Sequence, residues 1–414
     1  MVAPYVPDFD RASGSLRLYL MLRMLARRYR VVCLGRVNPA DPQSPRYVKA
    51  LEEVGIAVMP AQGVDVVDTI EKVGLCVFFE FFTTAEQSLG RVRRKRPDLP
   101  VVVDSVDLHF LREGRAANYA KRPWLARLRA ARTKKRELSV YGRADLILTV
   151  TENDRAQILR ERPEARVVVI PNIHRVRDAV PGFEARARHS VLFVGGFVHA
   201  PNVDAVMFFC RDILPSLRRA LPDVAVTIVG DRPPREILEL RGEGVAVTGW
   251  VPEIAPYLDA HCVGIAPLRF GAGMKGKVGE ALAAGLPIVT TSIGAEGMDL
   301  EDGITAMIAD SPQAFADAVA RLCTDPTLHG QLSKEGRAHV QRRWDLTAVE
   351  GKLVAAIESV RAIRPKSMTS SERLAALAQD VYLRSGLAHK VQRVGSAATW
   401  YANRVYGRFS GGDR

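Results

Sequence analysis

The sequence predicts an α/β protein built from two doubly wound domains, each around a parallel sheet. Strand-like apolar runs alternate with helix-like segments along most of the chain, which is typical of parallel sheets covered by helices. The alternation begins at residues 30–35 and begins again at 190–196. The polar, charged stretch 174–189 lies between the two series and is predicted to be a linker.

Each half contains six runs with strand character. They lie at 30–35, 55–60, 74–82, 100–107, 144–151 and 166–172 in the first half, and at 190–196, 225–231, 245–250, 263–268, 287–293 and 305–310 in the second. A domain of this kind normally opens with a buried strand, but the chain opens with MVAPYVPDFDRASGS, which is predicted to be a loop leading to a helix. We therefore expect the first strand to be short, missing or upstream of residue 1.

Four segments follow from these patterns. We expect a first domain at 1–185, a second domain at 186–345, a connecting helix at 346–364 and a basic helical tail at 365–414. The tail mixes arginines with aromatic side chains, which suits a membrane interface, although a helix packed on the body of the protein would show the same pattern. Its aromatic residues include Trp400, Tyr401 and Tyr406.

Composition and charge limit the class of protein. The hydrophobic fraction of 47% is typical of a globular chain, and five scattered cysteines without paired spacing indicate reduced thiols and a cytoplasmic location. The formal charge of +13, with basic clusters at 90–97 and 134–136, favours an anionic partner. Solvated arginines would also explain this charge. No motif for reading nucleic acid accompanies it, so an anionic membrane surface or a phosphorylated substrate is the expected partner.

The segment PLRFGAGMKGKVGEALAAGLP (267–287) carries the strongest chemical signal. Gly271, Gly273 and Gly276 follow a strand-like run and precede a predicted helix at 277–284. A glycine loop at a helix N-terminus presents backbone N–H groups and the positive end of the helix dipole, so it binds anions. Three cations, Arg269, Lys275 and Lys277, add full positive charges. Such a site suits a diphosphate whose negative charge grows during a reaction.

The same glycines also match G-x-G-x-x-G, and Glu296 follows at about the spacing of a ribose-binding acid in dinucleotide-binding proteins. That motif normally joins the first strand of its domain to a helix. Here it follows the fourth strand-like run of the second half. A backbone cradle for a pyrophosphate also has no need of three neighbouring cations. We therefore prefer a site for a leaving diphosphate over a dinucleotide site.

The second half, about residues 190–345, resembles the family 4 (group 1) retaining glycosyltransferases of the GT-B fold, of the type that builds bacterial surface polysaccharides. The motifs that carry the resemblance are VLFVGGFVHAPNVDAV, PDVAVTIVG, VTGWVPEI, APLRFGAGMKGKVGEALAAGLPIVTT and GAEGM. The family implies two Rossmann-like doubly wound parallel-sheet domains facing a cleft. It also implies that Lys277 and Arg269 hold the donor diphosphate, that Glu280 binds the ribose hydroxyls and that the loop 249–253 holds the base through backbone groups.

The resemblance also supplies the list of candidate site residues. The expected catalytic residues are Lys277, Arg269 and His109, and the expected donor-binding residues are Gly14, Gly196, Gly249, Trp250, Val251, Gly271, Gly273, Lys275, Glu280 and Glu296. Many members carry a glutamate eight positions before the one that matches Glu280, but this chain has Ala272 there. The identity of the donor sugar is therefore open. On residue chemistry alone, Glu280 and Lys275 could instead be solvent-facing charges.

In the first half, Ser13, Gly14 and Ser15 precede a predicted helix, where the family has a small-residue loop under the donor phosphates. A plain helix cap by a serine is the alternative. DSVDLHFLREGR (104–115) places His109 at the carboxyl end of a buried strand, where open α/β sheets bind ligands. A structural histidine is the alternative. The DFD at 8–10 is a weak candidate for a metal site, because it follows no apolar strand.

These features predict the transfer of a sugar, with retention, from a nucleotide-diphosphate sugar to a hydroxyl of a saccharide or lipid-linked acceptor. We expect no metal and no other cofactor, because the cations already neutralise a diphosphate. The chain would work in the cytoplasm, with the surface of the inner membrane as a candidate site of action. Two alternatives use the same cleft, a nucleotide-sugar epimerase of the GT-B fold and a catalytically silent partner subunit.

Overall fold

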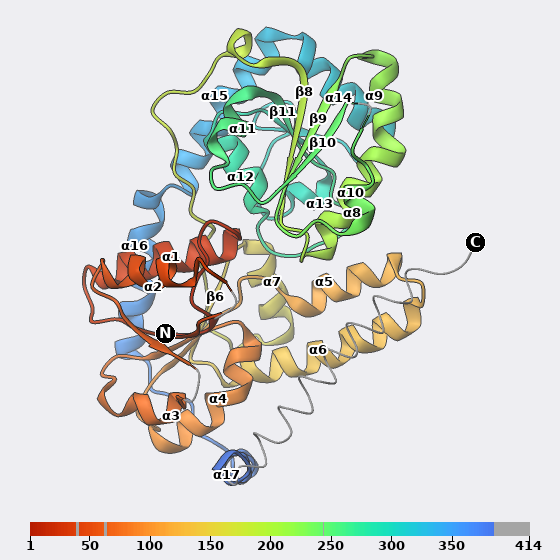
Figure 1. The fold of residues 1–414 in the computed structure, drawn as a ribbon. Coiled ribbons are helices and arrows are strands. Elements are labelled where there is room, and N and C mark those ends of the chain that lie inside the picture. Colours follow the sequence, from red (N-terminus) through yellow and green to blue (C-terminus); the bar gives the residue numbers. More distant parts are fainter. Residues whose placement is uncertain (39–40, 62–63, 243, 385–414) are drawn as a thin grey trace.

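The computed structural model describes residues 1–384 except 39–40, 62–63 and 243, and it consists of two α/β domains, each around a parallel sheet (Figure 1). Each of the twelve predicted runs overlaps a strand of the structure. The aromatic residues expected in the tail, Trp400, Tyr401 and Tyr406, lie outside the described residues.

The first domain contains a seven-stranded parallel sheet in the order β3-β2-β1-β4-β5-β6-β7. Its strands are β1 (Val2–Tyr5), β2 (Val32–Arg36), β3 (Ala57–Pro60), β4 (Val77–Glu80), β5 (Val101–Asp104), β6 (Leu146–Thr149) and β7 (Val167–Val169). Its helices are α1 (Ser13–Ala26), α2 (Ser44–Glu52), α3 (Val66–Thr69), η1 (Ile70–Lys72), α4 (Phe82–Lys95), α5 (His109–Ala116), η2 (Ala117–Tyr119), α6 (Pro123–Arg143) and α7 (Glu152–Glu161).

The opening segment contains a short first strand, which is one of the outcomes expected for it. Residues 1–15 are not all loop, because Val2–Tyr5 form β1, a short strand in the middle of the sheet between β2 and β4. The pairing of β1 with β2 is irregular between Val2 and Tyr5, next to Pro4, which has no N–H to donate. The prolines make this segment resemble a loop. Pairing with β2 on one side and with β4 on the other nevertheless makes it a strand.

The second domain contains a six-stranded sheet in the order β10-β9-β8-β11-β12-β13, also parallel throughout. Its strands are β8 (Ala187–Val194), β9 (Ala225–Val229), β10 (Val245–Gly249), β11 (His261–Ala266), β12 (Ile288–Thr290) and β13 (Met307–Ile308). Its helical segments are η3 (Phe183–Ala185), α8 (Ala200–Phe208), the π-turn η4 (Phe209–Ile213), α9 (Leu214–Ala220), α10 (Arg235–Leu238), α11 (Ala255–Ala260), α12 (Gly276–Ala283), α13 (Ser292–Ala295), α14 (Pro312–Thr324) and α15 (Pro326–Arg343).

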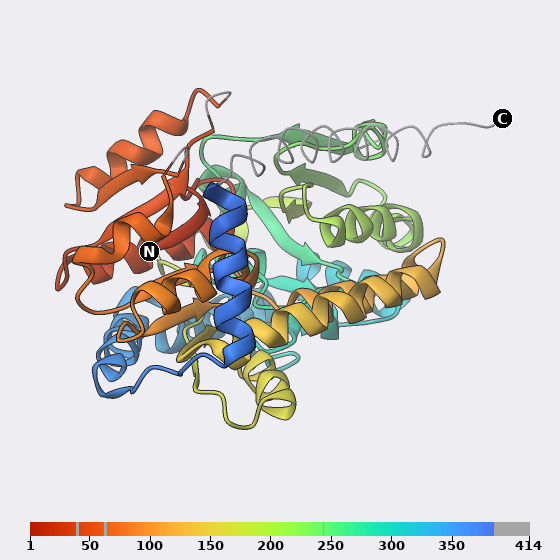
Figure 2. The ribbon, with the colours of Figure 1, turned by 90° about the horizontal axis from the view of Figure 1, so that it is seen from below.

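The last described elements return to the first domain. Helix α16 (Leu346–Ser359) buries Val349, Leu353 and Ile357 in one cluster with Met21 and Met24 of α1. The turn η5 (Val360–Ala362) follows. Helix α17 (Ser370–Arg384) lies against α4, and it crosses the first domain in Figure 2. Among the described residues, no helix is both long enough and apolar enough to span a membrane.

Candidate active site

The two domains meet at the glycine loop before α12. Gly273 has a φ of +68°, and a Cβ on it would lie 2.9 Å from the carbonyl oxygen of Val106 and 3.0 Å from Cβ of Asp107. A Cβ on Gly276 would lie only 2.3 Å from Cβ of Ser13. Both positions therefore need glycine, because a side chain would push the loop away from the first domain.

Two helix N-termini converge at this junction. Helix α1 begins at Ser13 and α12 begins at Gly276, and neither has a hydrogen bond from a capping side chain. The alternative, a serine cap on α1, is wrong: the N-cap residue is Ala12, and the Ser15 hydroxyl donates to Asp8 at 2.6 Å. The N–H groups of both first turns lack intrahelical acceptors and carry the positive ends of the two dipoles. The arrangement suits an anion held between the domains.

Lys277 lies in the first turn of α12. Its ammonium donates to Oδ1 of Asn202 at 2.8 Å and lies 5.5 Å from the ring centre of Phe193. Among the described residues it has no carboxylate within ion-pair distance. Burial, followed by the charge of Lys275, lowers the pKa of Lys277 to about 8. An anion beside this ammonium would raise that pKa and would be bound more tightly in return.

Arg269 is held at the edge of the same junction. Its guanidinium forms an ion pair with the Asp204 carboxylate, with Nε 2.9 Å from one oxygen and Nη2 close to the other. Its Cζ lies 4.7 Å from the ring centre of Tyr119 and 4.9 Å from that of Phe208. The hydrogen bonds with Asp204 raise the pKa of Arg269 further. To reach a diphosphate, Arg269 would have to share or leave Asp204.

Lys275 does not face solvent, so that alternative is wrong. Its ammonium is buried and donates to the carbonyl of Gly273 at 2.9 Å, and it lies 3.9 Å from the Glu296 carboxylate. Burial lowers the pKa of Lys275 to about 8, although Glu296 acts to raise it. Lys275 therefore fixes the turn of the glycine loop from within.

Glu296 joins the domains. Its two carboxylate oxygens accept from Arg115 of α5 at 2.5 and 2.7 Å, and Arg115 also donates to the carbonyl of Gly271 at 2.8 Å. Burial acts to raise the pKa of Glu296, but the bonds with Arg115 outweigh it and the pKa is lowered. The structure thus places Glu296 in a contact between domains, where its carboxylate is already occupied.

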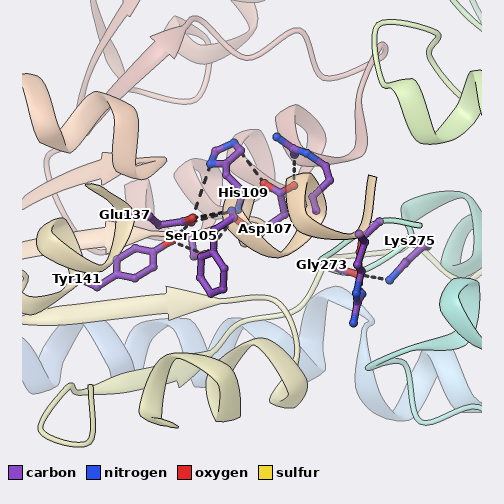
Figure 3. Close-up of polar contacts among 11 residues, drawn as sticks. Ser105, Asp107, His109, Glu137, Tyr141, Gly273 and Lys275 are labelled. Carbon is purple, nitrogen blue, oxygen red and sulfur yellow. Dashed lines mark hydrogen bonds and ion pairs between the residues drawn. The ribbon is translucent and has the colours of Figure 1, made fainter. Parts of the chain in front are cut away.

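His109 begins α5, and a buried carboxylate organises the start of that helix. Glu137 of α6 accepts from the backbone N–H of His109 at 3.2 Å and of Phe110 at 3.0 Å, and Tyr141 donates to it at 2.8 Å. Burial raises the pKa of Glu137 to about 7. Figure 3 shows this network together with Gly273 and Lys275 of the second domain.

The His109 ring lies beside this network, with its Nδ1 4.0 Å from Oε1 of Glu137. Its Nε2 is 3.5 Å from Oδ1 of Asp107, and its Nδ1 is buried without a hydrogen bond. Burial lowers the pKa of His109, so the ring is neutral near pH 7. Asp107 is in turn held by Arg112. Val106, directly before it, has a φ of 53°, a strained value for a β-branched residue and one that clusters at functional sites.

The remaining predicted residues surround the junction. Gly249 ends β10 with a φ of +81°, Trp250 is partly exposed with the Arg11 guanidinium 5.9 Å from its ring centre, and Val251 packs against the core of the second domain. Gly196 and Gly14 also face the other parts of the junction: a Cβ on Gly196 would lie 3.9 Å from the Arg11 carbonyl oxygen, and one on Gly14 would lie 3.4 Å from Cγ1 of Val106.

Glu280 lies one turn after Lys277 on α12. Its carboxylate is half-buried, and burial raises its pKa. Within the described part of the chain it makes no side-chain hydrogen bond. Its oxygens are therefore available to hydroxyl donors.

The carboxylates of the DFD segment at 8–10 already have partners. Asp8 accepts from Ser15, and Asp10 accepts from Tyr47 at 2.6 Å and pairs with Arg46. Among the residues that the structure describes, no group of three acidic, histidine or cysteine side chains could hold a metal ion.

Sequence reasoning missed four residues that organise the site. Asn202 and Asp204 lie inside VLFVGGFVHAPNVDAV and Arg115 ends DSVDLHFLREGR, so the quoted motifs contained them without showing which cation each would hold. Glu137 had no signal of its own. It lies in a basic helical stretch, and only the packing of α6 against α5 brings it to the N-terminus of α5.

The second domain is similar to known glycosyltransferase sequences. Residues 188–325 match the family model of the glycosyl transferases group 1. A putative glycosyltransferase, YtcC of Bacillus subtilis (strain 168), is 34% identical over 91 residues, 21% of this chain and 22% of that protein. An uncharacterized 44.6 kDa protein in the cps region of Klebsiella pneumoniae is 25% identical over 165 residues, 38% of this chain and 42% of that protein. Both alignments thus span less than half of the relative's length.

The two domains together match a known architecture. The structure of Anabaena Alr3699/HepE in complex with UDP and glucose is similar over 86% of this chain and 98% of that chain, with a TM-score of 0.61 and 13% identity. The fold is therefore GT-B. Within it, residues 188–325 of the second domain match the glycosyl transferases group 1.

Proposed function

We propose that the chain is a retaining glycosyltransferase, which moves a sugar from a nucleotide-diphosphate sugar to an acceptor hydroxyl. The observation that carries the proposal is the meeting of two uncapped helix N-termini, at Ser13 and Gly276, beside the ammonium of Lys277, which has no carboxylate partner among the described residues. A diphosphate is the anion that such a cradle fits. The group 1 domain and the UDP and glucose of the Anabaena structure support this donor.

The reaction breaks the bond between the anomeric carbon and the diphosphate oxygen. As it breaks, the sugar gains oxocarbenium character and the diphosphate gains charge. Lys277 and the two helix N-termini stabilise that charge more in the transition state than in the ground state, which is what accelerates the step. The acceptor oxygen bonds to the anomeric carbon on the face that the diphosphate leaves, and its proton passes to the departing phosphate oxygen. No enzymic nucleophile is required.

The other site residues have roles in binding. The free carboxylate of Glu280 accepts from the ribose hydroxyls, and the backbone of 249–251 holds the base. Arg269 exchanges its ion pair with Asp204 for the diphosphate. His109, neutral and in the cleft, hydrogen-bonds the donor sugar or the acceptor hydroxyl.

The acceptor belongs to polysaccharide or glycolipid assembly. The relative in the cps region of Klebsiella pneumoniae and the resemblance to bacterial polysaccharide enzymes support this class. The acceptor is then a saccharide or a lipid-linked saccharide, and the enzyme works in the cytoplasm at the surface of the inner membrane.

Neither alternative finds a supporting observation. An epimerase needs an acid and a base free at the sugar, but Asp107, the obvious partner of His109, is already held by Arg112. A silent subunit has no need of a half-buried lysine that has no carboxylate partner among the described residues, since taking that charge out of water costs stability.

The test is a screen of nucleotide-diphosphate sugars for release of the nucleoside diphosphate, with and without saccharide acceptors. We expect slow hydrolysis of one donor alone and faster release with an acceptor. A parallel thermal-shift series should show stabilisation by the matching nucleoside diphosphate, as mass action requires for a ligand of the folded state. Stabilisation without turnover of any donor would indicate a silent subunit. The absence of both stabilisation and turnover would refute the donor site.

A further inference from the structure

The hairpin formed by α5, η2 and α6 (residues 109–143) carries an unbroken run of positive charge. No acidic residue occurs between Glu113 and Glu137, whereas nine cations do. They are Arg115, Lys121, Arg122, Arg127, Arg129, Arg132, Lys134, Lys135 and Arg136. Such a run on one projecting element concentrates the basic charge of the chain at one place.

Part of this charge is neutralised within the molecule. Arg115, Lys134 and Arg136 pair with acids on other elements. Lys121, Arg122, Arg132 and Lys135 are exposed, and within the described part of the chain they have no acidic partner. Arg127, also exposed, hydrogen-bonds the neutral Asn118, and no acid among the described residues pairs with it.

The other basic cluster, at 90–97, behaves differently. The Arg91 and Arg93 side chains are buried in ion pairs with Asp65 and Asp145. Lys95 and Arg96 also pair with acids. Despite its density of cations in the sequence, this cluster is therefore mostly neutralised by the fold, and the exposed charge lies on the hairpin.

Apolar side chains stand among the free cations. Trp124 is 64% exposed and Leu128 is 52% exposed, and they lie one turn apart at the start of α6. Arg132 and Lys135 continue the same face at helical spacing, so the four residues form one stripe. We call Trp124, Leu128, Arg132 and Lys135 the α6 stripe. Large apolar side chains flanked by cations are the composition of a helix that lies in a membrane interface.

The position of the hairpin connects this stripe to the active site. In Figures 1 and 2 the hairpin extends away from the sheet of the first domain. Its turn reaches the second domain, where the Tyr119 ring stacks on Phe270 with centroids 5.4 Å apart and also contacts Arg269. Any external surface that binds the α6 stripe would therefore also lie close to Arg269 and Phe270, directly before the glycines of the donor loop.

We propose that the α6 stripe docks the enzyme on an anionic lipid bilayer and so brings the cleft to an acceptor carried by that bilayer. Trp124 and Leu128 enter the interface, while the exposed cations bind anionic headgroups, each worth about 1 kcal/mol near the surface. This inference rests on the proposed function for the identity of the acceptor, but the docking itself does not need turnover.

Vesicle co-sedimentation tests the docking. The full chain should pellet with phosphatidylcholine vesicles that contain phosphatidylglycerol, should pellet poorly with phosphatidylcholine alone, and should dissociate at high salt. The double variant Trp124→Ser/Leu128→Ser should bind at least about tenfold more weakly. A charge variant, Arg132→Gln/Lys135→Gln, should also bind more weakly. It tests the same surface independently if the first variant does not fold.

A matched control lies on α17, where Leu374 is 69% exposed and Leu377 is 47% exposed. Leu374→Ser/Leu377→Ser should bind anionic vesicles like the wild type, and so should a chain truncated after Pro365. Loss of binding in these variants, with binding retained in both α6 stripe variants, would move the docking to the tail and overturn the proposal. Equal binding to neutral and anionic vesicles would also overturn it, as would tight binding to single-stranded RNA in place of vesicles.

Donor hydrolysis in solution separates the two proposals. The α6 stripe variants should hydrolyse the donor at the rate of the wild type, because the stripe does not contact the donor site. They should lose only the stimulation by a lipid-linked acceptor in vesicles. If no donor is hydrolysed by any form of the protein but vesicle binding follows the pattern above, the proposed function fails and the docking surface stands.

Discussion

The contact between Gly276 and Ser13 offers a direct perturbation of the site. A Cβ on Gly276 would lie 2.3 Å from Cβ of Ser13 and 2.5 Å from its Oγ. Two carbon atoms are in comfortable contact at about 3.5–4.0 Å. In Gly276→Ala the N-termini of α1 and α12 must therefore separate by more than about 1 Å. Neither Cβ can rotate away, because each is fixed to its backbone.

A separation of this size should disable the donor site without unfolding the protein. A misplacement of 1 Å costs roughly 10²-fold in rate when it spoils the alignment of catalytic groups. We therefore expect Gly276→Ala to lower kcat/KM for donor hydrolysis by about 10²-fold. The melting temperature should change little, because the domains can move apart at their junction.

Removing the Ser13 side chain, which the new Cβ would meet, should restore activity. In the double variant Gly276→Ala/Ser13→Gly the nearest remaining neighbour is Nδ2 of Asn172 at 3.7 Å, an ordinary contact. Its activity should return to that of Ser13→Gly alone. Gly351→Ala, on a helix with open space around it, is the control for the change of residue type. Full activity in Gly276→Ala, or no rescue in the double variant, would refute the convergence of the two helices as the basis of the site.

Three further predictions concern single side chains. Burial lowers the pKa of Lys277 from 10.5 to about 8. Holding this side chain charged in the folded protein costs about 3 kcal/mol of stability at and below pH 8. The cost decreases as the pH rises toward 10.5, where the unfolded chain also loses the proton. Lys277→Met should therefore stabilise the protein near pH 7 by about 2 kcal/mol after the loss of the Asn202 bond, with no gain near pH 10, in urea unfolding against the exposed-site control Lys352→Met. Glu280→Ala should weaken nucleoside-diphosphate binding by about 1–3 kcal/mol in titration calorimetry, and unchanged affinity would mean that Glu280 does not bind the ribose. His109→Phe keeps the ring packing against Phe81 and Phe82 but should lower kcat by about 10²-fold, and wild-type turnover would leave His109 a structural role.

Much of the fold follows from the sequence because parallel strands buried on both faces must be apolar. Apolar runs such as 100–107 and 144–151 can therefore be recognised as strands in the sequence, and their grouping along the chain predicts two sheets. The position of the first strand could not be assigned from the sequence, because its four residues include a proline and show no pattern that distinguishes a strand from a loop. Its place in the middle of the sheet is decided by pairing with β2 and β4, which are distant in sequence.

For the site, the sequence located the loop and its cations but not their partners. Glycine spacing and charge predict an anion site, whereas the bond from Lys277 to Asn202 and the pair of Arg269 with Asp204 depend on how α8 packs beside α12. Charge density was misleading at 90–97, where the fold buries arginines in ion pairs. A linear pattern cannot show which cations the fold will neutralise.

The role of Lys277 and the two helix N-termini in holding a diphosphate can be measured by titration calorimetry with a nucleoside diphosphate and its nucleoside, on the wild type and on Lys277→Met. We expect the wild type to bind the diphosphate much more tightly than the nucleoside, because the helix N-termini and Lys277 hold the phosphates. Lys277→Met should lose at least about tenfold in affinity for the diphosphate, the value of one charge-assisted hydrogen bond, and none for the nucleoside. Equal affinity of the wild type for the two ligands, or an unchanged diphosphate affinity in the variant, would contradict the account.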